Sequence, residues 1–93
     1  MEHSLATTFD PARAWTLGAQ VSLRDESFGA LAYHHGNRRL VFLKSRALVE
    51  LVRRLEEFAN VDEALDLMVP PDERTRYLEA LASLQRSDLL RER

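Results

Sequence analysis

The stretch YHHGNRRLVFLKS, residues 33–45, decides the fold of this 93-residue chain. Gly36 and Asn37 both tolerate positive φ angles, and the stretch closes with an apolar run that stops at a lysine. A two-residue turn at Gly36 and Asn37 would pair residues 31–35 with residues 38–42 as antiparallel strands. The stretch therefore predicts a β-hairpin whose last strand leads directly into whatever follows Ser45.

Another strand is expected ahead of this hairpin. VSLR, residues 21–24, alternates apolar and polar residues, and FGALAYH, residues 28–34, is rich in small and aromatic residues. The RDES segment, residues 24–27, should turn the first strand into the second. The result is a three-stranded antiparallel meander, in which LVFL, residues 40–43, lies at the edge of the sheet.

The pattern becomes helical after the hairpin. Ser45 stands where an N-cap belongs, and apolar residues then recur on one helical face to about residue 59. Asn60 and Glu63 have the spacing of a capping box, which opens a short second helix to about residue 68. Pro71 suits the first turn of a third helix, which should end near residue 86.

These elements predict an α+β, winged-helix-like fold in which a three-stranded antiparallel sheet is followed by three helices. The C-terminal segment DLLRER either adds a last strand or lies against the helices. We expect residues 1–14 to form an N-terminal tail that could be flexible, and residues 15–93 to form one domain.

Composition limits the function classes. The chain is 45% apolar and 30% charged, which is typical of a globular domain, and its net charge of −2 gives no broad field to attract phosphate. It has no cysteine, which excludes disulfides and thiolate chemistry. Neither a signal-peptide pattern nor a run of ~18 apolar residues is present, so we expect a cytoplasmic protein without a membrane partner.

Metal binding and catalysis are both disfavoured. His34 and His35 are adjacent, and adjacent strand residues point to opposite faces, so the two imidazoles do not converge on one ion. No nucleophile, metal-binding or phosphate-loop motif is present in the sequence. We expect no catalytic residues, no metal and no cofactor, and hence no enzyme.

Nucleic-acid binding has weak support. Arg38 and Arg39 beside the turn are more simply solvated, and the third helix begins PDERTRYLE, with mixed charge instead of a basic face. The aromatic residues are more simply core than the lining of a ligand pocket in so small a domain.

The edge strand, residues 40–43, remains as the feature to explain. It is apolar on both alternating sets and has no proline or internal charge to block another strand from pairing with it. Either the third helix or the C-terminal DLLR covers it, or a partner uses it. The residues alone leave both interpretations open.

A resemblance favours use by a partner. The segment FGALAYHHGNRRLVFLKSRALVELV, residues 28–52, resembles the mycofactocin precursor-peptide chaperones, which are similar to the peptide chaperone of pyrroloquinoline quinone biosynthesis. The likeness extends from about Trp15 to the C-terminus and is strongest in GNRRL and FLKS. One departure is His35, where an aromatic residue would be expected, and it affects only the details of the turn.

The resemblance implies a RiPP recognition element, which binds the leader of a ribosomally made precursor peptide and presents it to a radical S-adenosylmethionine (radical SAM) maturase without doing chemistry itself. In such domains the leader adds as a strand beside the third strand, in the groove toward the third helix. The implied peptide-binding residues are Arg39, Leu40, Val41, Phe42, Leu43, Tyr77, Leu81 and Leu84.

Two other functions stay open. One is a winged-helix nucleic-acid-binding module, which the acidic balance disfavours. The other is a homodimerisation module in which two edge strands pair across a two-fold axis. Under the chaperone hypothesis Arg38 and Arg39 are either rim charges that meet acidic leader residues or plainly solvated.

Overall fold

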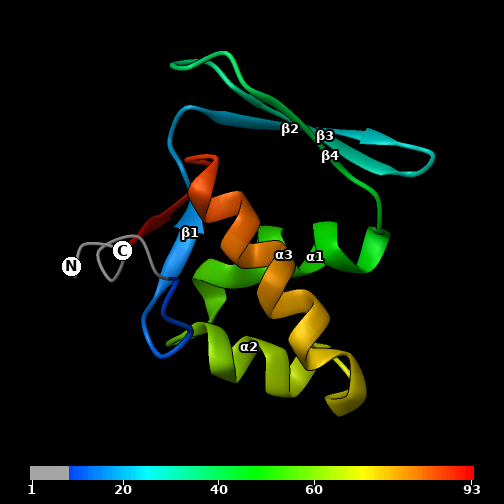
Figure 1. Ribbon diagram of the computed structural model, residues 1–93, viewed down its shortest axis with the longest axis vertical. Coiled ribbons are helices and arrows are strands. Elements are labelled where there is room, and N and C mark those ends of the chain that lie inside the picture. The colour runs from blue at the N-terminus through cyan, green and yellow to red at the C-terminus, as the bar shows by residue number, and fades with distance from the viewer. Residues whose placement is uncertain (1–8) are drawn as a thin grey trace.

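A computed structural model describes residues 9–93 of the chain, which fold into two small antiparallel sheets and three α-helices (Figure 1). The strands are β1 (Trp15–Leu17), β2 (Val21–Glu26), β3 (Gly29–His34), β4 (Leu40–Leu43) and β5 (Leu90–Glu92). The helices are α1 (Arg46–Arg54), α2 (Val61–Met68) and α3 (Arg74–Arg86), with short 3₁₀ turns at Leu55–Glu57 and Pro71–Glu73. The predicted α+β class and the order of sheet and helices are confirmed.

The main sheet has the order β2-β3-β4 and is antiparallel throughout. Leu31 lies opposite Phe42, which is the predicted register of the hairpin. The predicted two-residue turn is wrong, because residues 35–39 join the two strands, and a 2.9 Å hydrogen bond from His34 N to Arg39 O closes this loop. Arg38, rather than Gly36 or Asn37, takes the positive φ, at 66°.

Side chains explain this wider loop. Nδ1 of His34 accepts hydrogen bonds from the backbone N–H groups of Gly36 and Asn37, at 3.0 and 3.1 Å. The Asn37 side chain in turn accepts from the N–H of Arg39 at 2.9 Å. Side chains of the loop and its flanking strand thus accept hydrogen bonds from the backbone N–H groups of the loop. A two-residue turn would not need these side-chain acceptors.

The turn between β2 and β3 also differs from expectation. β2 continues through Arg24, Asp25 and Glu26, and Ser27 and Phe28 make the turn. The predicted turn at RDES is therefore wrong by two residues. Asp25 and Glu26 stay in the strand, where they bond to Arg53 and Arg24 at 3.0 and 2.8 Å.

The predicted starts of the first two helices are confirmed, whereas the third begins three residues later than expected, at Arg74, because Pro71–Glu73 form a 3₁₀ turn ahead of it. Oγ of Ser45 accepts from the N–H of Leu48, and Oδ1 of Asn60 accepts from the N–H of Glu63. The Glu63 carboxylate accepts a hydrogen bond from the N–H of Ala59, the residue before the cap, instead of from the N–H of Asn60 as in a standard capping box. The first helix is shorter than expected, because α1 ends at Arg54 and a 3₁₀ turn replaces its last turn.

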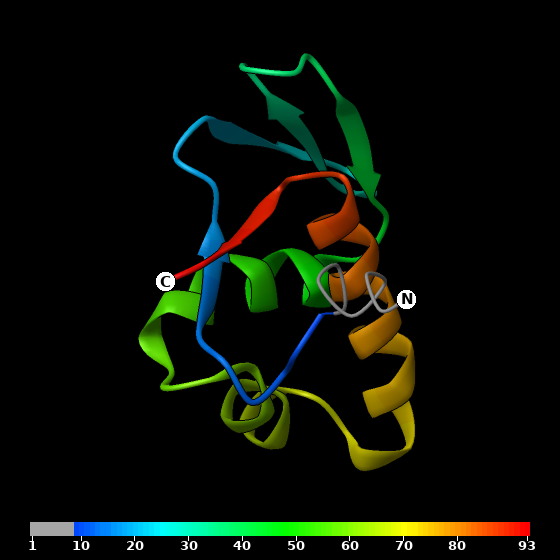
Figure 2. The ribbon, with the colours of Figure 1, turned by 60° about the vertical axis from the view of Figure 1, so that its left-hand side comes forward.

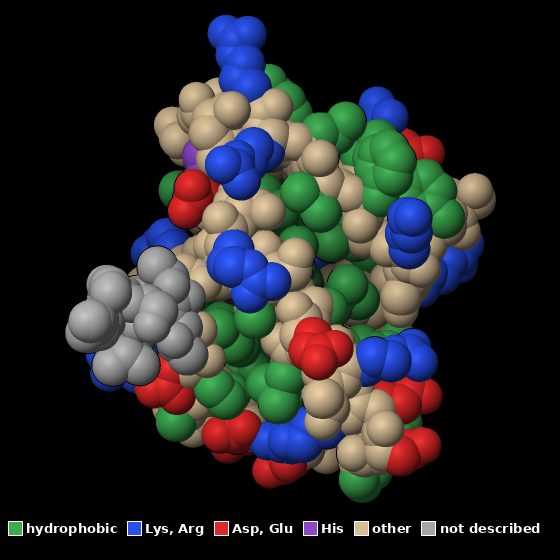
Figure 3. Space-filling model, viewed as in Figure 1, with side chains coloured by type: hydrophobic (Ala, Val, Ile, Leu, Met, Phe, Trp, Pro, Cys, Tyr) green, Lys and Arg blue, Asp and Glu red, His purple; other side chains and the backbone are tan. Residues whose placement is uncertain are grey.

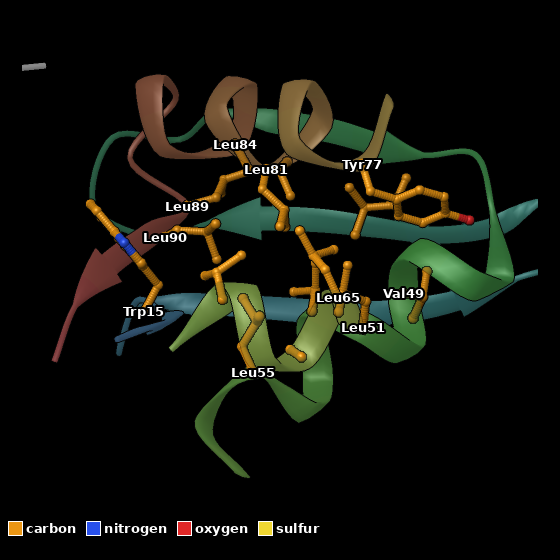
Figure 4. Close-up of a cluster of buried hydrophobic side chains, with 14 of the residues drawn as sticks. Trp15, Val49, Leu51, Leu55, Leu65, Tyr77, Leu81, Leu84, Leu89 and Leu90 are labelled. Atoms are coloured by element: carbon orange, nitrogen blue, oxygen red, sulfur yellow. The ribbon is translucent and has the colours of Figure 1, made fainter. Parts of the chain in front are cut away.

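The core lies between the inner face of the main sheet and the three helices, as Figure 4 shows for its larger side chains. The sheet contributes small residues, Ala30 and Ala32, and one large one, Leu43, which is 2% exposed. Small side chains on the sheet let the helices approach it closely. The helices and the C-terminal segment supply most of the remaining core, including Leu51, Val52, Leu55, Val61, Ala64, Leu65, Leu81, Leu84, Leu89 and Leu90.

The two ends of the described chain are tied together. β5 pairs with β1 in a second, two-stranded sheet, with Leu90 opposite Leu17 (Figure 2). The expected tail, residues 1–14, falls largely outside the described residues, but residues 9–14 pack on the domain: the rings of Phe9 and Trp15 lie 4.9 Å apart, and Pro11 O accepts from Asp62 N. Packing thus extends beyond the boundary that we expected at residue 15.

No helix in residues 9–93 is long and apolar enough to cross a membrane.

Candidate functional site

β4 is the free edge of the main sheet, and the structure determines which of its backbone groups are unpaired. The N–H of His34 bonds to Arg39 O, whereas the N–H of His35 bonds to Gln20 O, so His34 directs its backbone groups toward the β4 side and His35 toward the β2 side. Because bonding alternates along antiparallel strands, Val41 and Leu43 also point their backbone groups toward β3. Leu40 and Phe42 therefore point their N–H and C=O groups outward, and no hydrogen bond between residues 9–93 occupies them.

The two proposed covers of this edge lie elsewhere. The C-terminal segment pairs with β1 as β5 instead of packing over β4. α3 lies below the free edge and on the same side of the molecule (Figure 2), without hydrogen bonding to it. Within the described part of the chain, the edge is open.

The side chains of β4 alternate between two environments. Leu40 and Phe42 are each 55% exposed on the outer face, whereas Val41 is half-buried and Leu43 is buried against the core. On the outer face, the rings of Phe42 and Phe28 lie 5.7 Å apart. We call the apolar side chains of this face the outer patch; they are the exposed Phe28, Leu40 and Phe42 and the half-buried Leu31 and Tyr33.

A pocket opens where β4 ends. It has a volume of about 240 Å³ and lies between the start of α1 and the N-terminal half of α3. Leu48, Tyr77 and Ala80 give it apolar walls, and the space-filling view shows apolar side chains exposed between the sheet and α3 with basic side chains beside them (Figure 3). We call it the α1–α3 pocket; it is lined by Lys44, Ser45, Leu48, Arg76, Tyr77 and Ala80.

The site residues that the sequence suggested fall into two groups in the structure, one at the surface beside the pocket and one in the core. It brings the β4 residues and Tyr77 to one side of the molecule, where Tyr77 is 8% exposed but lines the pocket. Leu81 and Leu84 are 0% and 4% exposed and lie among the core leucines (Figure 4). Their side chains support α3 from inside and present no surface to a partner.

Sequence reasoning missed several residues of the pocket. Arg76 and Ala80 are four residues apart and flank Tyr77, so they share the helical surface on which that tyrosine lies. That spacing was a usable signal. Leu48, on the apolar face of α1, packs against the core and is also partly exposed at the pocket.

Arg74 fixes the start of α3 and thereby the position of Arg76 and Tyr77. Its guanidinium bonds to Asp66 at 2.7 Å and to Asp62 at 2.5 Å, which links α3 to α2. The hydrogen bond to Asp66 raises the pKa of Arg74, partial desolvation opposes this rise, and the hydrogen bond to Asp62 adds to it.

The two histidines among the described residues, His34 and His35, both form hydrogen bonds within the main sheet and its loop. His34 accepts the loop N–H groups, and Nε2 of His35 lies 2.7 Å from Oγ of Ser22. Across residues 9–93, no group of three His, Asp or Glu side chains is placed to hold a metal ion.

A small domain that presents an unpaired strand edge next to an apolar pocket belongs to the class of binding modules. The profile of the Peptide chaperone MftB family matches residues 14–91, and the chain belongs to this family. It is therefore a non-catalytic peptide chaperone, as the resemblance implied.

Three relatives carry the same description. The chain is 45% identical over 84 residues to the peptide chaperone MftB of Mycolicibacterium smegmatis, covering 89% of this chain and 82% of that protein. Over 86 residues it is 45% identical to the MftB of Mycobacterium ulcerans and 40% identical to that of Mycobacterium tuberculosis, covering 91% of this chain and 79% of each relative. No solved structure matches the chain significantly.

Proposed function

We propose that this chaperone binds the leader of the precursor peptide in mycofactocin biosynthesis and presents it to a radical SAM maturase. The observation that carries the proposal is the open edge of β4, with Leu40 and Phe42 offering unpaired backbone groups beside the α1–α3 pocket. The mycofactocin assignment rests on the MftB relatives and on the resemblance of residues 28–52.

The proposed binding mode is strand addition. Leu40 and Phe42 each offer one N–H and one C=O outward, which makes four ladder bonds available to a guest strand. Side chains of a guest strand alternate between two faces. One set would lie beside the outer patch, and the other would face the α3 side, where Val41 and the pocket lie.

The expected affinity is moderate. Four ladder bonds at ~1 kcal/mol net each and about three apolar anchors at ~2 kcal/mol each give a gross ~10 kcal/mol. Ordering a flexible leader costs ~2–5 kcal/mol, which leaves ~5–8 kcal/mol and a dissociation constant that is micromolar at the favourable end. Binding of this strength suits a carrier, because tighter binding would slow release.

Presentation follows from this mode. Strand addition holds only the few residues that pair with β4, so the rest of the precursor remains free to enter the active site of the maturase. The exposed Arg38 and Arg39, at the loop end of β4, are placed to meet acidic residues of the leader and to speed association.

A homodimer through β4 is the second candidate, favoured by the exposed apolar side chains of Leu40 and Phe42 on an unpaired edge. Two such edges would pair across a two-fold axis and block the peptide site. Solution mass across protein concentration tests this: a concentration-dependent dimer that the leader dissociates supports it, and a monomer at all concentrations rejects it.

The proposed function is tested by calorimetric titration of the chain with a synthetic mycofactocin precursor peptide, at two salt concentrations. We expect saturable one-to-one binding near micromolar, weakened strongly by a charge at the groove-facing Val41, while helix content is unchanged. Absence of saturable binding would contradict the proposal. A steep fall of duplex DNA affinity with salt, without peptide binding, would favour the nucleic-acid alternative instead.

A further inference from the structure

The α1–α3 pocket carries two positive charges that have no carboxylate partner among residues 9–93. Lys44 and Arg76 line it from two different elements, and both are exposed. Within residues 9–93, no Asp or Glu lies within ion-pair distance of either, whereas Arg24, Arg53 and Arg74 each form such a pair. The two cations therefore flank an apolar cavity, and no carboxylate among residues 9–93 neutralises their positive charge.

Tyr77 adds a third donor to the same pocket. Its ring is buried, but in the close-up its hydroxyl oxygen points away from the core leucines (Figure 4). That hydroxyl makes no hydrogen bond with another described residue, and it is not among the buried unpartnered polar atoms. The pocket therefore combines apolar walls with an ammonium, a guanidinium and a phenol O–H.

The pocket lies directly on the path of an added strand. Lys44 is the residue that follows β4, two positions beyond Phe42, and a strand advances by about 3.3 Å per residue. A guest strand paired with Leu40 and Phe42 thus reaches the pocket within about two further residues. Every second side chain of the guest points toward the face on which the pocket opens.

We propose that the α1–α3 pocket is a subsite for one acidic side chain, aspartate or glutamate, of the bound leader; this proposal rests on leader binding at β4. The carboxylate pairs with Lys44 and Arg76 and accepts a hydrogen bond from Tyr77, while the methylene groups contact Leu48 and Ala80. A carboxylate is the anion that peptides carry, and Arg suits it particularly well because a guanidinium binds a carboxylate through two parallel bonds.

Such a subsite would set register as well as affinity. Ladder bonds are the same at every register, since they involve only backbone groups, so side-chain pockets must choose which leader residues pair with β4. A carboxylate that fits only here fixes the leader along the edge. A lysine or arginine at the same position would be rejected, because it would bring a third positive charge into the pocket.

The test is calorimetric titration of the full chain with the synthetic mycofactocin leader peptide and with variants in which each acidic residue is replaced in turn by its amide. The chain variants are Lys44→Glu and Arg76→Glu, with Arg86→Glu as the control. Arg86 is an exposed arginine on the same helix, about ten residues or ~15 Å from Arg76 along its axis.

We expect Lys44→Glu and Arg76→Glu each to weaken binding about tenfold or more, the size of one lost charge-assisted hydrogen bond, while Arg86→Glu stays within about twofold. One of the amide-substituted peptides should bind the unmodified chain with the same loss of affinity. That peptide should lose no further affinity when it is titrated into the Arg76→Glu chain. A peptide with lysine at the same position should bind the Arg76→Glu chain more tightly than it binds the unmodified chain.

Equal affinity of all three chain variants, with binding still lost on Phe42→Pro, would overturn the acidic subsite and leave strand addition standing. Absence of leader binding by the unmodified chain would overturn both proposals. Circular dichroism of each variant shows whether a loss reflects misfolding; if Arg76→Glu misfolds, Arg76→Gln gives the same reading.

Discussion

At the scale of single residues, Gly29 holds β4 in place. It has a φ of 149°, and a Cβ there would lie 2.0 Å from the carbonyl oxygen of Leu43 and 3.0 Å from the nitrogen of Ser45. Both neighbours are backbone atoms, which cannot move aside cheaply. The close approach of the β2–β3 turn to the end of β4 therefore requires a glycine, and it aligns the edge strand with the start of α1.

Gly29→Ala should lower the free energy of unfolding by more than about 2 kcal/mol, because it combines a strained φ with a backbone clash. Gly18→Ala is the matched control, since a Cβ there meets its nearest neighbour at an ordinary 3.4 Å. Urea unfolding of the two variants measures the difference. Equal stability would show that β4 does not depend on this contact.

At the same scale, the helix caps could be predicted from the sequence, whereas the hydrogen bonds by which side chains close the hairpin loop could not. The caps Ser45 and Asn60 were read correctly, because a cap depends on residues three positions apart. The loop was misread because the His34 side chain accepts hydrogen bonds from two backbone N–H groups, which stabilises a longer loop with Arg38 at positive φ. Nothing in the pattern of glycine and asparagine signals that contact.

At the scale of elements, the alternation of backbone and side-chain directions along β4 determines what each of its residues does. The register of the hairpin was predicted from a turn centred on Gly36 and Asn37, and it is confirmed, with Leu31 opposite Phe42, although the loop is wider than expected. The structure adds that Leu40 and Phe42 carry the outward backbone groups, whereas Val41 and Leu43 bond to β3. Adjacent residues on one strand should therefore respond differently to the same substitution.

Phe42→Pro should weaken leader binding about tenfold or more with little loss of stability, because it removes an outward donor that the fold does not use. Val41→Pro should instead lower the melting temperature, because it removes a donor that bonds within the sheet. Calorimetric titration and thermal unfolding of both variants check this. The reverse pattern would mean that the other set of backbone groups faces the guest.

At the scale of the whole molecule, the second sheet closes the fold. β1 and β5 come from opposite ends of the described chain and are three residues each, so neither is long enough to show a periodicity. Their pairing was open in the sequence for that reason. The same limit applies to α3, where the pattern marked Leu81 and Leu84 as an apolar face but could not tell core from groove.

Leu90→Ala should destabilise the chain by about 2–5 kcal/mol, because Leu90 is buried in the core and its removal leaves a cavity. Arg91→Ala, at the next position on the exposed side of β5, should change stability by less than about 0.5 kcal/mol. Urea unfolding gives both values. Similar small effects would mean that the chain ends contribute little to the fold.

The central claim, that a leader peptide adds as a strand to β4, is tested most directly by amide hydrogen exchange of isotopically labelled protein with and without saturating leader peptide. We predict that the amides of Leu40 and Phe42 exchange rapidly in the free chain and slow by about tenfold or more on binding, whereas Val41 and Leu43 are protected in both states. Saturable leader binding that leaves the exchange of Leu40 and Phe42 unchanged would contradict strand addition at this edge.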